Sequence, residues 1–103
     1  MVGALKGTTT PDEYMLYTAH WDHLGNKADA EKTGAPGETF FTDQIFNGAV
    51  DNATGIAALL EIAEKMATTE HERSVKFLFV TLEESGLLGS AYYAENPLVP
   101  LSK

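Results

Sequence analysis

Histidine and carboxylate side chains occur in three short segments of this sequence, and together they carry the donor atoms of a metal site. The residues are His20 with Asp22, then Asp51, then the adjacent pair Glu83 and Glu84. A catalytic zinc commonly takes three protein ligands from His, Asp and Glu and keeps one position open for water. His20, Asp51 and Glu84 could supply such a set. The chain has no cysteine, so thiolate sites and disulfides are excluded.

The first segment places a histidine and an aspartate two residues apart. On an extended backbone, side chains at i and i+2 point to the same side, so His20 and Asp22 can converge while Trp21 points away. A zinc-bound histidine usually gives its second ring N–H to a carboxylate, which fixes its orientation. Asp22 could act in this way, although a surface histidine beside an aspartate is the plainer interpretation of this segment alone.

Asp51 lies where a polar loop enters a helix, with Gly48 and Gly55 on either side. It could serve as a carboxylate that bridges two metal ions. The simpler interpretation is a helix N-cap, a role that Asp51 or Asn52 could fill.

Glu83 and Glu84 follow directly after a strongly apolar run. Two adjacent carboxylates repel each other in a low-dielectric site, and a metal ion removes that repulsion. One glutamate would then bind the metal while the other acts as general base for the attacking water. The alternative is a solvated strand end.

Other catalytic arrangements do not match the sequence. Ser85 and Ser90 lie outside any nucleophile-elbow pattern. The glycines around Asp51 lack the lysine of a phosphate-binding loop, and no His-Glu-x-x-His motif is present. We expect His23 at a loop surface and His71 in a charged, solvated turn.

Apolar periodicity predicts alternating strands and helices. We expect strands over residues 2–5, 14–19 and 74–82, and helices over residues 52–69 and 86–94. The last strand is nearly continuous in apolar residues, which is typical of a central parallel strand buried on both faces. The order of elements indicates an α/β fold with a right-handed crossover, and ligands bind at the carboxyl ends of the strands in such sheets.

Two segments between these elements carry turn or loop signals. Residues 8–12 are expected to form a turn around Pro11. Residues 26–46 form a long polar stretch without a clear period. A loop of this length is often functional, and a disordered excursion is the alternative.

Composition restricts the partners of the chain. Its 103 residues suffice for about one small domain. A net charge of −8, with scattered cations, disfavours nucleic acid, because phosphate binding requires clustered Lys and Arg. No run approaches the ~20 apolar residues that span a membrane, and we expect no signal peptide in residues 1–5, which lack a charged start and a long apolar stretch. Metal cations are therefore more plausible ligands of this acidic chain than nucleic acid.

Taken together, these motifs closely resemble those of the di-zinc exopeptidase family of bacterial leucyl aminopeptidases and glutamate carboxypeptidase. The matching stretches are residues 17–25, 47–55 and 81–90, and the likeness covers nearly the whole chain apart from the long loop. We therefore expect a three-layer αβα fold with a mostly parallel sheet, present here as a partial catalytic domain over residues 1–103. The resemblance also implies aminopeptidase activity on a peptide substrate, with two zinc ions in the family.

The resemblance further implies roles for the site residues. His20 and Glu84 would bind one zinc, and Asp51 would bridge that zinc to a second one. Glu83 would be the general base that deprotonates the attacking water, and Asp22 would orient His20. In such two-metal sites the ions lie ~3.5–4 Å apart and polarise both water and substrate.

The sequence departs from the family at the second zinc, which needs a further Asp and a further His downstream of the paired glutamates. No aspartate follows Asp51, and the last histidine, His71, precedes Glu83. The chain therefore looks like the N-terminal part of a catalytic domain with one nearly complete zinc site. We expect it to self-associate or to pair with the missing half, since open sheet edges attract further strands.

Two other interpretations stay open. The chain could be an inactive fragment or a non-enzymatic interaction module of the same family, which the missing ligands favour. It could also belong to a single-zinc acyl transferase of related fold, such as a glutaminyl cyclase. Residues 51–55 and the paired glutamates look more like the peptidases.

Overall fold

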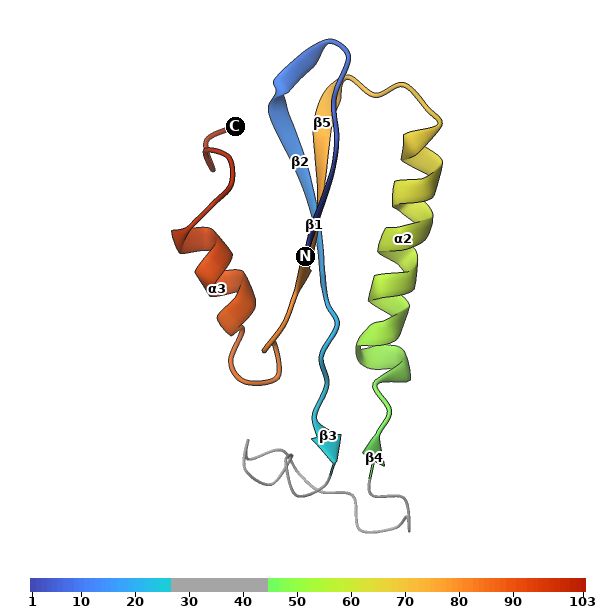
Figure 1. Cartoon of the computed structure of the whole chain (residues 1–103), viewed down its shortest axis with the longest axis vertical. Coiled ribbons are helices and arrows are strands. Elements are labelled where there is room, and N and C mark those ends of the chain that lie inside the picture. The colour runs from blue at the N-terminus through green and yellow to red at the C-terminus, as the bar shows by residue number, and fades with distance from the viewer. Residues whose placement is uncertain (27–44) are drawn as a thin grey trace.

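The computed structural model describes residues 1–26 and 45–103 of the chain. These residues form a small α/β unit with a three-stranded sheet of order β1-β5-β2 and a separate pair of short strands (Figure 1). The elements in chain order are β1 (Val2–Leu5), β2 (Thr10–His20), β3 (Gly25–Asn26), β4 (Ile45–Phe46), the short turn η1 (Ala49–Ala53), α2 (Thr54–Ala67), β5 (Arg73–Val80) and α3 (Leu88–Glu95). The predicted strands and helices are all present, with β2 longer than expected.

Strand β5 is the centre of the sheet, as its apolar sequence predicts. Val75 and Leu78 are both buried, and they lie on opposite faces because side chains alternate along a strand. β5 pairs in parallel with β2, and His20 lies opposite Val80 at the carboxyl end of the pair. The residues that follow these two strands therefore emerge at the same end of the sheet.

The sheet is mixed rather than mostly parallel, which corrects the expectation from the sequence. β1 runs antiparallel to β5. Only residues 6–9 join β1 to β2, and such a short connection reverses the chain, so β1 runs opposite to β2 and to β5, which lies between them. The predicted turn is also shorter than expected, because Pro11 lies inside β2. It falls at a pairing irregularity between Thr10 and Tyr14, where a residue without an N–H is tolerated.

Helix α2 forms the crossover between the parallel strands β2 and β5. Its buried Leu59 packs with Ala19, Val75 and Phe77 in the core. Phe77 also stacks on Tyr17, with ring centroids 5.7 Å apart. The core therefore joins the two parallel strands to the helix that connects them, and this fixes the end of β2 relative to the start of α2.

Helix α3 lies on the other side of the sheet from α2 (Figure 1). None of its residues is buried, so the core of the described residues lies between the sheet and α2. The structure is therefore a partial α/β domain, and the full three-layer arrangement stays a prediction. In the part of the chain that the structure describes, neither helix has the length and apolar character to cross a membrane.

The predicted long loop, residues 26–46, lies mostly outside the described residues. Its two ends are described: β3 and β4 pair antiparallel, with Gly25 opposite Phe46. The chain therefore leaves and re-enters the unit at neighbouring points, shortly before the turn that carries Asp51.

Large apolar side chains on the surface predict that the chain self-associates. Leu60 on α2 is 57 % exposed, and Met15 and Leu16 on the edge strand β2 are also exposed. Burial of apolar surface is favourable by roughly 25 cal/mol per Å². We expect size-exclusion chromatography with light scattering to give a mass above that of one chain, rising with protein concentration.

Two lysine substitutions on α2 test the apolar origin of this association. Leu60→Lys should move the chain toward the monomer. Ala58→Lys adds the same charge at an exposed position of the same helix and should have little effect. A monodisperse monomer at every concentration would contradict the prediction.

Candidate metal centre

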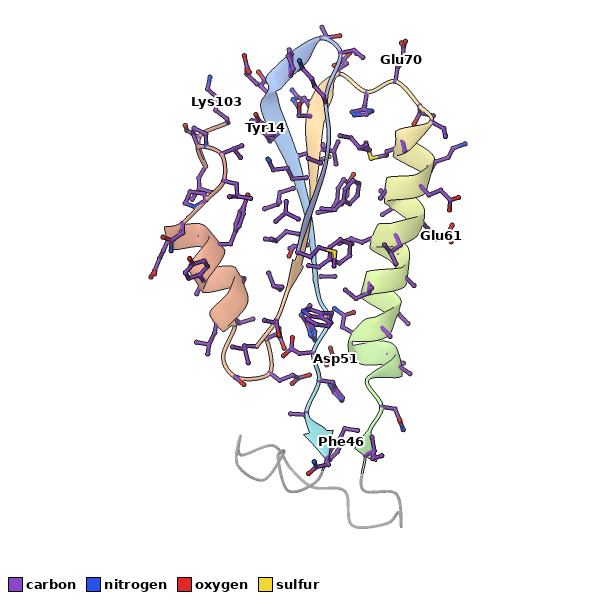
Figure 2. All side chains as sticks on the ribbon, viewed as in Figure 1. Tyr14, Phe46, Asp51, Glu61, Glu70 and Lys103 are labelled. Atoms are coloured by element: carbon purple, nitrogen blue, oxygen red, sulfur yellow. The ribbon has the colours of Figure 1, made fainter. Side chains whose placement is uncertain are left out.

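The five side chains predicted to form the metal site converge at the carboxyl end of the parallel strand pair. His20 ends β2 and is followed by Asp22, Asp51 lies in η1 before α2, and Glu83 and Glu84 follow β5. Figure 2 shows Asp51 at this end of the sheet, beside the start of α2. Two strand ends and the approach to a helix therefore position the whole set, as is usual for ligand sites in open α/β sheets.

His20 is held with its two ring nitrogens facing different partners. Only 8 % of the residue is exposed. Nδ1 donates a hydrogen bond to the backbone carbonyl of Asp22 at 3.0 Å. Nε2 lies 2.9 Å from Oδ1 of Asp51 and 3.9 Å from Oε2 of Glu83. Asp22 thus holds the ring through its carbonyl rather than through the carboxylate that the sequence suggested.

The carboxylate of Asp22 still lies close to the ring. Its Oδ1 is 3.6 Å from Nδ1 of His20. This oxygen is buried and has no hydrogen-bond partner among the described residues. Its negative charge therefore acts on His20 across a short distance without a direct hydrogen bond.

The two acceptors around His20 create an electrostatic conflict that a cation resolves. A carbonyl oxygen only accepts hydrogen bonds, so Nδ1 carries a proton and the neutral ring has a lone pair at Nε2. That lone pair faces the carboxylate of Asp51, which is also an acceptor when ionised. A second proton or a metal ion is therefore needed between these two atoms.

In the absence of metal, the surrounding negative charge holds that second proton. Burial acts to lower the pKa of His20. The hydrogen bond to Asp22 and the charges of Glu83 and Asp51 outweigh burial, so the pKa is raised above its ordinary value of 6.5. Zinc binds the neutral imidazole and would compete with this proton for Nε2. With Nδ1 already bonded to a protein oxygen, His20 has the usual environment of a zinc ligand.

Asp51 is presented by an irregular turn rather than by a regular helix start. Its φ and ψ of −119° and 92° are extended, and its peptide bond to Asn52 is cis. Neither predicted residue is the N-cap of α2, which is Ala53, but Oδ1 of Asn52 accepts a hydrogen bond from the backbone N–H of Gly55 at 3.0 Å. The carboxylate of Asp51 is thus left to face His20, with 63 % of the side chain exposed.

Glu83 and Glu84 point to different histidines. Leu82, just before them, has a left-handed backbone with a φ of 59°, which is uncommon for a residue other than glycine. Oε2 of Glu83 lies near Nε2 of His20, whereas Oε1 of Glu84 is 2.7 Å from Nδ1 of His23. The two adjacent carboxylates therefore have separate partners within one site.

His23 is a member of the site that the sequence interpretation missed. We expected it at a loop surface, but the residue is half-buried and paired with Glu84. Its ring meets Phe46 edge-on, with centroids 6.3 Å apart. Gly48 makes room for it, because a Cβ there would lie 3.0 Å from Cβ of His23. The three-residue spacing from His20 was a signal that could have revealed it.

His71 also differs from the expected solvated turn. Its Nε2 is buried and has no hydrogen-bond partner in the described ranges, while Nδ1 donates to the carbonyl of Thr69 at 3.0 Å. Its own carbonyl accepts from the backbone N–H of Thr8 at 3.0 Å. His71 therefore supports the connection between β1 and β2, at the opposite end of β5 from the metal centre.

The donor atoms form two overlapping groups, in each of which the ligand atoms lie within 4.8 Å of one another. The groups are His20 with Glu83 and Glu84, and His23 with Asp51 and Glu84. The predicted set of His20, Asp51 and Glu84 draws on both groups. Imidazole nitrogen and carboxylate oxygen are ligands that zinc accepts at ~2.0–2.2 Å, so the chemistry of the donors fits this metal.

Comparisons with known proteins match the whole chain to one family. The profile of peptidase family M28 matches residues 1–103. A probable zinc metalloprotease of Pyrenophora tritici-repentis is 33 % identical over 96 residues, which are 93 % of this chain and 20 % of that protein. Aminopeptidase NAALADL1 of Rattus norvegicus is 29 % identical over 109 residues, covering 100 % of this chain and 12 % of that protein.

A bacterial relative matches a shorter stretch. Aminopeptidase YwaD of Bacillus subtilis is 35 % identical over 49 residues, which are 48 % of this chain and 11 % of that protein. No solved structure gives a significant match. The matched stretches thus cover between 11 % and 20 % of the length of these three relatives.

The contact between His20 and Asp51 predicts a pH-dependent stability of the metal-free chain. Because the folded pKa of His20 is raised above 6.5, the folded chain holds this proton more tightly than the unfolded chain. The resulting stabilisation is fully present below about pH 6.5 and is lost as the pH rises through the folded pKa. With a chelator present, we expect this contribution to the midpoint of thermal unfolding to fall as the pH rises above about 6.5.

The variant Asp51→Asn provides the comparison for this prediction. It should reduce the pH-dependent loss of stability and lower the pKa of His20 measured by NMR titration. An unchanged His20 pKa in Asp51→Asn would show that the carboxylate does not hold the proton.

Proposed function

Because the chain belongs to peptidase family M28, we propose that it is part of a zinc-dependent exopeptidase that removes N-terminal residues from peptides with a metal-activated water. Relatives named zinc metalloprotease and aminopeptidase support the metal and the type of peptidase. In this proposal the chain contributes one zinc half-site, the bridging carboxylate and the general base. The remaining ligands come from another segment of the complete catalytic domain.

One contact carries the proposal: Nε2 of His20 faces Oδ1 of Asp51 at 2.9 Å while Nδ1 is bonded to the carbonyl of Asp22. A ligand histidine has this arrangement, with one nitrogen fixed by a protein acceptor and the other offered to the metal. In the metal-free chain a proton at Nε2 satisfies Asp51, and in this proposal zinc takes the place of that proton.

We assign His20, Asp51 and Glu84 as zinc ligands, with Asp51 as the carboxylate that bridges to a second zinc. The placement of Asp51 supports this role. Asp51 contacts His20, and it also belongs to the cluster of possible ligand atoms that contains Glu84 and His23. No aspartate follows Asp51 in the sequence, and every histidine precedes Glu83. The second zinc would therefore depend on ligands from outside this chain.

Glu83 is assigned as the general base. Zinc bound at this site would polarise the attacking water and the carbonyl of the scissile peptide bond. Oε2 of Glu83 lies 3.9 Å from Nε2 of His20, which is inside the site but beyond hydrogen-bond distance. The carboxylate can thus accept a proton from the water and pass it to the leaving amine.

Zinc binding by the purified chain tests the ligand assignment. We expect native mass spectrometry to detect one bound zinc per chain. Loss of an outer-shell partner lowers metal affinity about 10–100-fold. Glu84→Gln should lower the zinc affinity by more than this. Glu61→Gln removes the same charge from an exposed position of α2 and should leave zinc binding unchanged. Equal affinities for the two variants would refute the assignment of Glu84.

Hydrolysis of a leucine anilide tests whether the half-site is active alone. Since Asp51 is the only ligand that this chain is proposed to give the second zinc, we expect the zinc-loaded chain to show no chelator-sensitive hydrolysis. If such hydrolysis is found and Glu83→Gln lowers it about 10²–10⁴-fold while keeping zinc bound, the chain itself carries a complete catalytic centre. A chain that binds no zinc at all would instead support a non-enzymatic module.

A further inference from the structure

The structure pairs each of the two adjacent glutamates with its own histidine. Glu83 faces His20 across 3.9 Å, and Glu84 accepts a hydrogen bond from Nδ1 of His23 at 2.7 Å. The second distance is that of a strong, charge-assisted hydrogen bond. His23 therefore acts directly on the carboxylate that the proposed function assigns to zinc.

The bonding around His23 differs from that around His20 in one decisive respect. An ionised carboxylate only accepts hydrogen bonds, so the Nδ1 of His23 that faces Glu84 carries the proton. Within residues 1–26 and 45–103, the structure gives the His23 ring no second acceptor. One neutral tautomer thus satisfies His23 without a metal, whereas His20 needs a further proton or a cation at Nε2.

Residues other than the two glutamates also hold the ring of His23 in place. Phe46 meets it edge-on at 6.3 Å with an interplanar angle of 77°, and Gly48 approaches its Cβ closely. Figure 2 shows Phe46 on β4, at the same end of the sheet as Asp51. The pairing of β3 with β4 therefore fixes a hydrogen-bond donor beside Glu84 before any metal binds.

We propose that His23 is a positioning residue of the metal centre, whose Nδ1–H holds Oε1 of Glu84 so that Oε2 is presented to zinc and Glu84 is kept apart from Glu83. This inference rests on the proposed function, because it takes Glu84 as a ligand. His23 thereby gives two chemically identical neighbours different tasks: Glu84 is fixed as a ligand, and Glu83 stays available as a base.

Two substitutions separate the hydrogen bond from the packing of the ring. His23→Phe keeps an aromatic ring against Phe46 but removes the donor, whereas His23→Asn places an amide N–H near the position of Nδ1. Zinc affinity is measured by competition with a fluorescent chelator, and zinc stoichiometry by native mass spectrometry. We expect His23→Phe to lower the zinc affinity about 10–100-fold while the chain still binds one zinc ion. His23→Asn should keep most of the wild-type affinity.

Other outcomes of the binding experiment overturn the proposal. Unchanged affinity in His23→Phe would make His23 a bystander. Loss of the bound zinc in both variants, with the fold intact by circular dichroism, would make His23 a ligand instead. Equal, partial weakening in both variants would point to ring packing rather than to the hydrogen bond.

A measurement on the metal-free wild-type chain tests the hydrogen bond of His23 independently of zinc binding and of the folding of the variants. Long-range ¹H–¹⁵N NMR distinguishes the two neutral tautomers of histidine, and the signals of His23 are identified by their absence in His23→Asn. We expect the Nδ1–H tautomer, and the Nε2–H tautomer would refute the hydrogen bond to Glu84. If the wild-type chain shows the expected tautomer but binds no zinc, the proposed function fails while the hydrogen bond stands, and His23 then has no metal centre to position.

Discussion

The candidate metal centre depends on one contact, that between Nε2 of His20 and Oδ1 of Asp51. The two residues come from different segments and meet because the end of β2 and the approach to α2 share one end of the sheet. Ala19, directly before His20, packs against Leu59 of α2 in the core. The packing of the crossover helix on the sheet therefore sets the position of the two donor atoms relative to each other.

Parallel pairing brings the glutamates to the same place. His20 lies opposite Val80 in the ladder, so the residues after β5 emerge beside the end of β2. The left-handed Leu82 turns the chain there, and such a conformation persists only where its surroundings enforce it. The first residues of α3 do so, since the N–H groups of Leu88 and Gly89 donate to the carbonyls of Leu82 and Thr81. α3 thus supports the site although it adds little to the core.

The sequence predicted those features that local patterns determine. The apolar period of α2 and the continuous apolar run of β5 identified both elements. The run in β5 is largely buried, whereas in α2 only the side of the helix around the buried Leu59 faces the core and Leu60 is exposed. The direction of β1 depends on a connection too short for a crossover, and a mostly parallel sheet was the wrong expectation. His23 was missed because its partners, Glu84 and Phe46, come from distant parts of the sequence, and its spacing from His20 alone does not identify them.

Charge links the site to the stability of the fold. The chain has a net charge of −8, and four of its carboxylates gather around two histidines at one end of the sheet. A cation that binds only this folded arrangement stabilises it by about 2.7 kcal/mol when its free concentration is 100 times the dissociation constant. Small domains unfold at a cost of only about 5–15 kcal/mol, and the described residues bury few apolar side chains. A zinc ion bound at the candidate centre would therefore couple metal binding to folding, because it would hold the end of β2, the turn before α2 and the turn after β5 together.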